Sequence, residues 1–190
     1  MAWDLETTDL KALMGRVLCC SFMEITPPGT ALRRPYTFRG DRAPWMNVPT
    51  SKWHEDPEAI SDAKLVVAIR DELERYNMIV SWNGKLFDAA FLNARLLKIR
   101  ERPLRPQFHL DSMWYAAGSS NRIGSRKLDN VQRFLGLSES KTPITWEDWQ
   151  RAGMGNMKAF NQVVKHCEQD VKVLAQAYWR FLPNVSSIHR

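Results

Sequence analysis

The stretch AWDLETT, residues 2–8, alternates apolar and acidic side chains near the start of the sequence. Successive side chains of a β-strand point to opposite faces, so Trp3 and Leu5 share one face and Asp4 and Glu6 share the other. Two carboxylates on one face of a half-buried strand repel each other and resist desolvation. Divalent cations such as Mg²⁺ and Mn²⁺ relieve this cost because they bind oxygen ligands of this kind. The stretch therefore predicts either half of a metal site or a solvated acidic edge.

The composition is that of an ordinary globular domain with a basic surface. The sequence has 190 residues, of which 44% are hydrophobic and 25% charged, enough for one domain with a substantial core. A formal net charge of +6 around an acidic centre indicates a polyanionic partner such as nucleic acid. No apolar run approaches the length of a membrane span and the N-terminus carries no signal segment, so we expect a cytoplasmic protein without membrane association.

The cysteines argue against a disulfide-stabilised or zinc-binding domain. Cys19 and Cys20 are adjacent and Cys167 is far away in the sequence, which gives neither a disulfide framework nor the spacing of zinc ligands. This usage is typical of a reduced compartment.

Strand and helix patterns alternate along the chain and predict an α/β fold with a mixed central β-sheet flanked by helices. Apolar periodicity and turn residues predict strands at 2–8, 15–25, 34–38, 78–82 and 108–110. The same signals predict helices at 56–76, 87–97, 128–135 and 157–181, and one that begins at Ser112 and is capped by Asp111.

Tryptophans stand out in two segments that lack a clear period. Trp45 and Trp53 lie in an irregular stretch, where they either form stacking surfaces or fill the edge of the core, and the second interpretation is favoured. Residues 138–155 are polar, with Trp146 and Trp149 expected to anchor the segment.

Two further carboxylates lie in the middle and near the end of the chain. Asp88 follows a strand and an Asn83-Gly84 turn, in the first turn of a predicted helix, where the helix dipole favours negative charge. Asp170 lies in the last predicted helix among apolar positions, one turn after His166. Each also has an ordinary explanation, as a helix-terminal acid and as half of a surface His–Asp pair.

Taken in order, the patterns DxET at 4–7, NGxxFD at 83–88 and HxxxD at 166–170 resemble the three motifs of the DEDD superfamily of 3′–5′ exonucleases, whose members have a ribonuclease H-like fold. The resemblance extends over nearly the whole chain. The chain also resembles the compact stand-alone members of this superfamily that are found in phages. This resemblance implies a single exonuclease domain over residues 1–190, located in the host cytoplasm if the gene belongs to a phage.

The resemblance implies that Asp4, Glu6, Asp88 and Asp170 hold two divalent cations, Mg²⁺ or Mn²⁺, at the carboxyl end of the sheet. Such a pair activates a water molecule and stabilises the leaving oxygen in phosphodiester hydrolysis. The family places a Tyr four residues, or a His five residues, before the last Asp, whereas His166 stands at the Tyr spacing. Because imidazole accepts a proton near neutral pH, we expect His166 to orient or deprotonate the attacking water. The alternative is a His on the helix surface.

Substrate contacts follow from the same motifs. By resemblance, the backbone of Thr7 contacts the terminal nucleotide, and Leu10 or Phe87 is placed to wedge against the last bases. Asn83 either hydrogen-bonds near the scissile sugar or makes the turn, and Lys85 is placed to meet phosphates. The other basic residues expected at phosphates are Arg122, Arg126 and Lys127.

The expected function is a metal-dependent 3′–5′ exonuclease that hydrolyses phosphodiester bonds at the 3′ ends of single-stranded DNA or RNA, with DNA favoured. A ribonuclease H-like endonuclease and a non-catalytic nucleic-acid-binding module are the alternatives.

Overall fold

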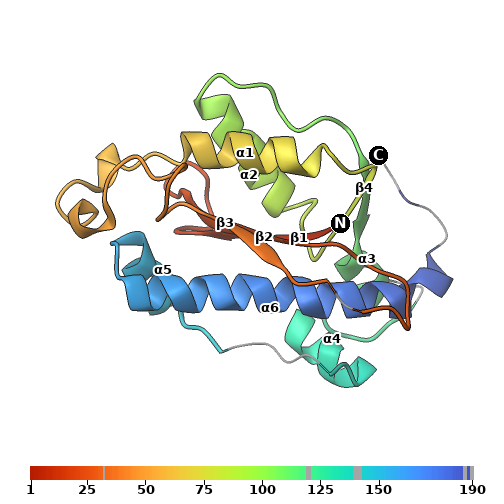
Figure 1. Ribbon diagram of the computed structural model, residues 1–190. Helices are drawn as coiled ribbons and strands as arrows, with labels where there is room; N and C mark the ends of the chain where they lie inside the picture. Colours follow the sequence, from red (N-terminus) through yellow and green to blue (C-terminus); the bar gives the residue numbers. More distant parts are fainter. Residues whose placement is uncertain (32, 119–120, 139–142, 186–187, 189–190) are drawn as a thin grey trace.

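The computed structural model describes residues 1–31, 33–118, 121–138, 143–185 and 188, whose strands form a mixed sheet with helices on both faces (Figure 1). Within these residues the strands are β1 (Ala2–Thr7), β2 (Val17–Met23), β3 (Tyr36–Arg39), β4 (Met78–Ser81) and β5 (Phe108–Asp111). Their order in the sheet is β3-β2-β1-β4-β5. The first three strands pair antiparallel, whereas β4 runs parallel to β1 and β5 parallel to β4. The predicted α/β fold with a mixed central sheet is confirmed, and β1 is its middle strand.

The helices lie in two layers around this sheet. They are α1 (Ala63–Leu73), α2 (Asp88–Lys98), α3 (Ser112–Ala117), α4 (Leu128–Leu135), α5 (Trp146–Gly153) and α6 (Met157–Phe181), with 3₁₀ turns at Thr50–Lys52, Pro57–Ala59 and Leu182–Asn184. Helices α1 and α2 lie on one side of the sheet, and α6 runs along the other side together with α4 and α5 (Figure 1). Among the described residues, no helix has the length and apolar character needed to cross a membrane.

The alternation of β1 sends its side chains to different layers. Trp3 and Leu5 are buried in the apolar cluster that the sheet forms with α1 and α2. Ala2 packs in the cluster formed with α6. Asp4 and Glu6 share the face of Ala2, because side chains two apart on a strand point the same way. The sequence therefore predicted correctly which side chains share a face.

A buried ion pair joins the start of β2, α1 and α2. The Arg95 guanidinium donates to both carboxylate oxygens of Asp62, at 2.7 and 2.9 Å, and the Val17 amide donates to the same carboxylate at 2.8 Å. Arg95 also donates to the carbonyl of Ala12, in the loop after β1. This network holds the middle and the end of the loop between β1 and β2 against α2.

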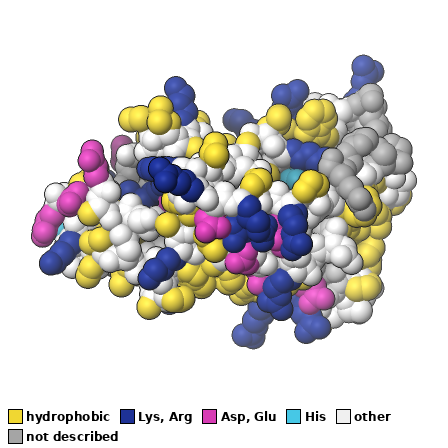
Figure 2. Space-filling model, turned by 90° about the horizontal axis from the view of Figure 1, so that it is seen from above, with side chains coloured by type: hydrophobic (Ala, Val, Ile, Leu, Met, Phe, Trp, Pro, Cys, Tyr) yellow, Lys and Arg dark blue, Asp and Glu magenta, His cyan; other side chains and the backbone are white. Residues whose placement is uncertain are grey.

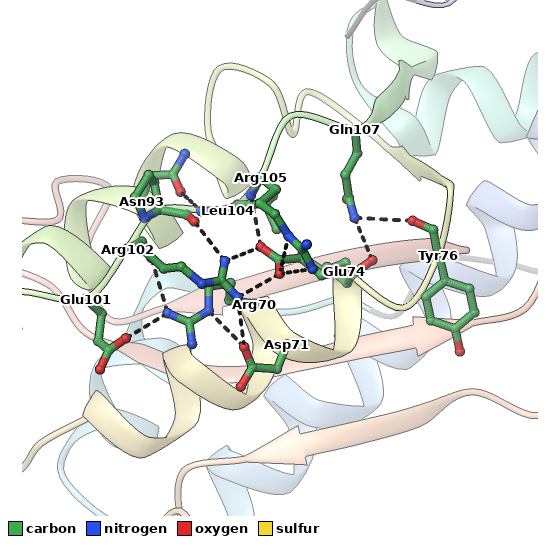
Figure 3. A network of polar contacts seen from close by, with 12 residues as sticks. Arg70, Asp71, Glu74, Tyr76, Asn93, Glu101, Arg102, Leu104, Arg105 and Gln107 are labelled. Atoms are coloured by element: carbon green, nitrogen blue, oxygen red, sulfur yellow. Dashed lines mark hydrogen bonds and ion pairs between the residues drawn. The ribbon is translucent and has the colours of Figure 1, made fainter.

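A second network holds the basic connector after α2 on the end of α1 (Figure 3). Glu74, at the end of α1, accepts hydrogen bonds from the side chains of Arg102 and Arg105, and Arg70 donates to Glu101. The hydrogen bonds from Arg102 are the main reason that the pKa of Glu74 is lowered to about 2. Viewed from this side, the surface shows Lys and Arg side chains next to Asp and Glu (Figure 2). Several of the basic side chains are therefore paired within the protein.

The helix predicted over 56–76 is wrong at its start. Asp56 instead caps a 3₁₀ turn that has Pro57 at its first position, and Ile60 is extended, so α1 begins only at Ala63. The apolar spacing that includes Ile60 therefore continues across residues that are not helical. A side chain can pack against the core without its backbone being helical, so the spacing alone does not give the start of the helix.

Both tryptophans of the irregular segment fill the core edge, as favoured. Trp53 is 2% exposed and its indole donates to the carbonyl of Val48, so the stacking-surface interpretation is wrong for it. Trp45 stacks on Phe38 with ring centroids 4.6 Å apart. In the polar segment 138–155, α5 was not predicted; residues 139–142 of that segment lie outside the described residues.

Candidate active site

A pocket of about 600 Å³ lies at the carboxyl ends of β1 and β4, beside α6. Asp4, Glu6, Asp88 and Asp170 all line it, together with His166. These side chains come from β1, α2 and α6, which are far apart in the sequence. The structure thus brings the five residues of the three motifs to one place.

Asp88 reaches β1 where the two parallel strands separate. The pairing of β1 with β4 joins Ala2 to Val80, near the start of β1. Further along β1, the Leu5 amide donates to Asp88 Oδ1 at 3.0 Å. Asp88 is also the first residue of α2, where the helix dipole favours a negative charge. In open α/β sheets, ligands commonly bind in the crevice between the carboxyl ends of two neighbouring strands that separate.

Burial makes the Asp88 carboxyl hard to ionise. Its pKa is raised from 3.8 to about 7, first by burial and then by the negative charges of Asp111 and Asp170, against the hydrogen bond from Leu5. The side chains around Asp88 therefore disfavour another negative charge in the pocket. A bound cation reverses this balance, since it favours the ionised carboxylate.

His166 lies between the carboxylates of β1 and α6. Its Nε2 is 4.0 Å from Glu6 Oε1 and 3.9 Å from Asp170 Oδ2. The residue is only 5% exposed, so the interpretation as a histidine of the helix surface is wrong. At the Tyr spacing of the last motif, the imidazole faces the pocket.

The donor set of the pocket fits hard divalent cations. Carboxylate oxygens of Asp4 and Glu6 lie within 4.8 Å of each other and of Cys167 Sγ. Burial raises the pKa of Cys167 well above its usual value, and its thiol donates to the carbonyl of Asp4. A neutral thiol is a poor ligand for Mg²⁺ or Mn²⁺. The carboxylates of Asp4 and Glu6, with those of Asp88 and Asp170 in the same pocket, are the ligand type that these ions prefer.

The segment that leads into α4 adds positive charge to the pocket. Arg126 and Lys127 both line it, and the Trp82 indole fixes the segment by donating to the Arg126 carbonyl at 2.9 Å. Lys85 and Arg122, also expected at phosphates, are not among the described residues that line this pocket.

Of the expected substrate residues, Asn83 and Phe87 line the pocket, whereas Thr7 and Leu10 are not among the described residues that line it. Asn83 has φ of 64°, donates its amide to Asp111 and makes the turn before α2, and it also lines the pocket. Phe87 lines the pocket as well. The Thr7 hydroxyl donates to the carbonyl of Asp9, within the turn after β1. Leu10, in the same turn, is 72% exposed.

Trp149, on α5, lines the pocket, although the sequence predicted only that it anchors the segment 138–155. Its indole Nε1 donates to Glu6 Oε2. The signal that points to this helix is the capping box formed by Thr145 and Asp148, whose hydrogen bonds begin α5. The capping box predicts where the helix begins, but it does not predict that Trp149 contacts Glu6, because these two residues are 143 positions apart in the sequence.

The strand order β3-β2-β1-β4-β5 among the described residues, with β2 antiparallel to both its neighbours and helices on both faces, is the arrangement expected of a ribonuclease H-like fold. Residues 46–181 match the family model of the RNase_H superfamily, and the chain belongs to this superfamily. The match includes Asp88, His166 and Asp170 and begins after Asp4 and Glu6. No curated protein sequence matches the chain.

The fold is also similar to part of a solved polymerase. The structure of the family B DNA polymerase from the hyperthermophilic archaeon Pyrobaculum calidifontis matches with a TM-score of 0.65 and 14% sequence identity. The match covers 96% of this chain and 24% of the polymerase chain. The chain therefore spans about a quarter of that polymerase, and the likeness is one of fold.

Proposed function

We propose that this chain is a metal-dependent 3′–5′ exonuclease of the DEDD type, a single domain that acts on 3′ ends of single-stranded nucleic acid. The observation that carries the proposal is the convergence of Asp4, Glu6, Asp88 and Asp170 on one pocket. Membership of the RNase_H superfamily supports a nuclease. DNA is the substrate to test first, because the similar solved structure is that of a DNA polymerase.

In this proposal the carboxylates of Asp4, Glu6, Asp88 and Asp170 hold two divalent cations, Mg²⁺ or Mn²⁺. When bound, these ions supply an activated water and charge stabilisation at the leaving oxygen. Burial, together with the negative charges of Asp111 and Asp170, raises the pKa of Asp88, and this cost of the ionised carboxylate supports a site that favours cations.

His166 has the role of proton acceptor. Its Nε2 is held near Glu6 and Asp170 in a buried position, where the carboxylates stabilise the imidazolium that forms when it takes a proton from the attacking water. A base of this kind contributes about 10²–10⁴-fold to the rate.

The substrate enters along the positive side of the pocket. Arg126 and Lys127 contact the phosphates of the 3′-terminal nucleotides, because they line the same pocket as the carboxylates. Phe87 lines the pocket and offers an aromatic ring to a terminal base, and Leu10, exposed in the turn after β1, is the second candidate for an apolar contact with a base.

The test is digestion of 5′-labelled single-stranded DNA and RNA oligonucleotides with Mg²⁺, Mn²⁺ or chelator. We expect a ladder that shortens from the 3′ end, only with metal, and no product from Asp4→Ala or Asp170→Ala. Asp71→Asn is the matched control, because Asp71 lies on α1 within the network of Figure 3 and should keep full activity.

Two outcomes contradict the proposal. Cleavage of a circular single-stranded DNA at an initial rate equal to that of the linear form indicates an endonuclease. Metal-independent binding without any product indicates a non-catalytic binding module.

A further inference from the structure

Trp149 contacts two of the residues that the proposed function places in the active site. Its Nε1 donates to Glu6 Oε2 at 2.6 Å, and its ring lies at 90° to the His166 ring with centroids 5.7 Å apart. A hydrogen bond to an ionised carboxylate is among the stronger ones in proteins. One side chain from α5 therefore restrains both a carboxylate of β1 and an imidazole of α6.

Groups other than Trp149 hold helix α5 on the loop between β1 and β2. The Gln150 side chain donates to the Thr8 carbonyl at 3.0 Å, and Arg16 donates to the carbonyl of Gly153. Ala152 is fully buried in the cluster that includes Phe160 of α6. Because these contacts hold the helix, loss of the Trp149 indole should leave α5 in place.

The hydrogen bond from the Trp149 indole sets the orientation of the Glu6 carboxylate. The last torsion of a glutamate is broad, so its two oxygens exchange positions easily unless one of them is held. Here Oε2 is held by Trp149, and Oε1 is the oxygen that lies toward His166 Nε2, at 4.0 Å. The perpendicular contact with Trp149 restrains the imidazole at the same time.

We propose that Trp149 is a positioning residue of this active site, which orients Glu6 toward the metal ions and fixes His166 beside it. The inference rests on the proposed function. It adds that α5, through its indole, is needed for the metal site. Partners that orient metal ligands typically contribute about 10- to 100-fold to metal affinity or activity.

The experiment compares three full-length proteins with the wild type. Trp149→Phe removes the N–H and keeps an aromatic ring, and substitution of Trp149 by β-(3-benzothienyl)alanine replaces the N–H by sulfur in a ring of nearly the same shape. Trp146→Phe is the matched control, because Trp146 lies on the same helix, is half exposed and is not among the described residues that line the pocket.

Calorimetric titration with Mn²⁺ is the first measurement. We expect both Trp149 variants to bind Mn²⁺ about 10- to 100-fold more weakly than the wild type and to lose kcat by a similar factor, with KM for the oligonucleotide little changed. Trp146→Phe should match the wild type in all three. If Trp149→Phe fails to fold, as judged by circular dichroism, the benzothienyl variant carries the comparison.

The indole N–H resonances provide a second measurement that needs neither metal nor activity. The sequence has eight tryptophans, and the signal lost in Trp149→Phe identifies that of Trp149. We expect this signal to shift in Glu6→Gln, because the charge that accepts its hydrogen bond is removed.

The two proposals fail in different ways. A wild-type protein that digests no nucleic acid under any condition overturns the proposed function, whereas the indole signal still reports on the contact. Unchanged Mn²⁺ affinity and kcat in the benzothienyl variant, or an indole signal unmoved by Glu6→Gln, overturns the role of Trp149.

Discussion

Replacing Asp88 by Asn should stabilise the protein in chelator while it abolishes hydrolysis. The Asp88 side chain is buried, at 4% exposure, and lies near the negative charges of Asp111 and Asp170. An Asn has the same shape and keeps an oxygen that accepts the hydrogen bond from the Leu5 amide. The substitution therefore removes a buried charge and leaves the packing intact.

The size of the effect follows from the pKa of Asp88. Its rise from 3.8 to about 7 corresponds to about 4 kcal/mol, at about 1.36 kcal/mol per pKa unit. The folded state holds the proton more tightly than the unfolded state, so this stability is present below about pH 4 and is lost as the pH rises to about 7. Loss of the negative charge at the start of α2 costs about 0.3–1 kcal/mol. We expect a net gain of about 3 kcal/mol above pH 7, or roughly 6–12 °C in Tm.

Urea unfolding in chelator, followed by circular dichroism from about pH 4 to about pH 8, measures this difference. The gain of Asp88→Asn over the wild type should grow as the pH rises from about 4 through about 7 and level off only above that. Addition of Mg²⁺ should stabilise the wild type more than the variant, because a ligand stabilises only the state that binds it. Asp129→Asn is the control: Asp129 lines the same pocket with an exposed side chain, and its loss should change the stability by less than about 1 kcal/mol.

A wild type in chelator that is as stable as Asp88→Asn at pH 8, or more stable, would refute this reasoning. In that case the Asp88 carboxylate is accommodated without a cation, and the cost of burying its charge near other carboxylates is not what drives metal binding. If Asp88→Asn is more stable than the wild type by the same amount at every pH, the ionisation of Asp88 is not the cause of the difference.

Three further predictions concern other parts of the molecule. His166→Ala should lower kcat by about 10²–10⁴-fold in steady-state digestion, and a loss below tenfold contradicts its role as a base. Arg95→Ala leaves Asp62 buried without its cation and should lower the free energy of unfolding by about 3–5 kcal/mol in urea titrations. Glu74→Gln should cost about 1–2 kcal/mol, since its arginine partners are about half exposed or more. That cost should be present above about pH 4.5 and vanish as the pH falls toward 2, and a pH-independent cost would contradict it.

Much of the fold could be predicted because its signals are local. The alternation in residues 2–8 reports which side chains share a face of β1, and the apolar stripe of 157–181 gives the bounds of α6. Asp111 was expected to cap the helix at Ser112, and its carboxylate accepts the Met113 amide. Each of these signals lies within a few residues of the structure that it produces.

Two other points of the fold were not determined by the local pattern. The apolar period from Ile60 onward predicted a helix, but Pro57 and the extended Ile60 place the start of α1 at Ala63. Trp53 has no sequence signal that separates a stacking surface from a core residue, and the cluster with Phe160 buries it. Such outcomes depend on partners elsewhere in the chain, which a local pattern does not contain.

For the candidate site, the acidic residues were identified by the resemblance of three motifs to a known family, whereas strand alternation and helix spacing predicted only which side of its element each carboxylate occupies. The packing of the whole chain is what separates β1 from β4 far enough for Asp88 to reach the Leu5 amide. It alone also placed the indole of Trp149 on Glu6. These contacts join positions far apart in the chain, and their geometry follows from how the helices pack on the sheet.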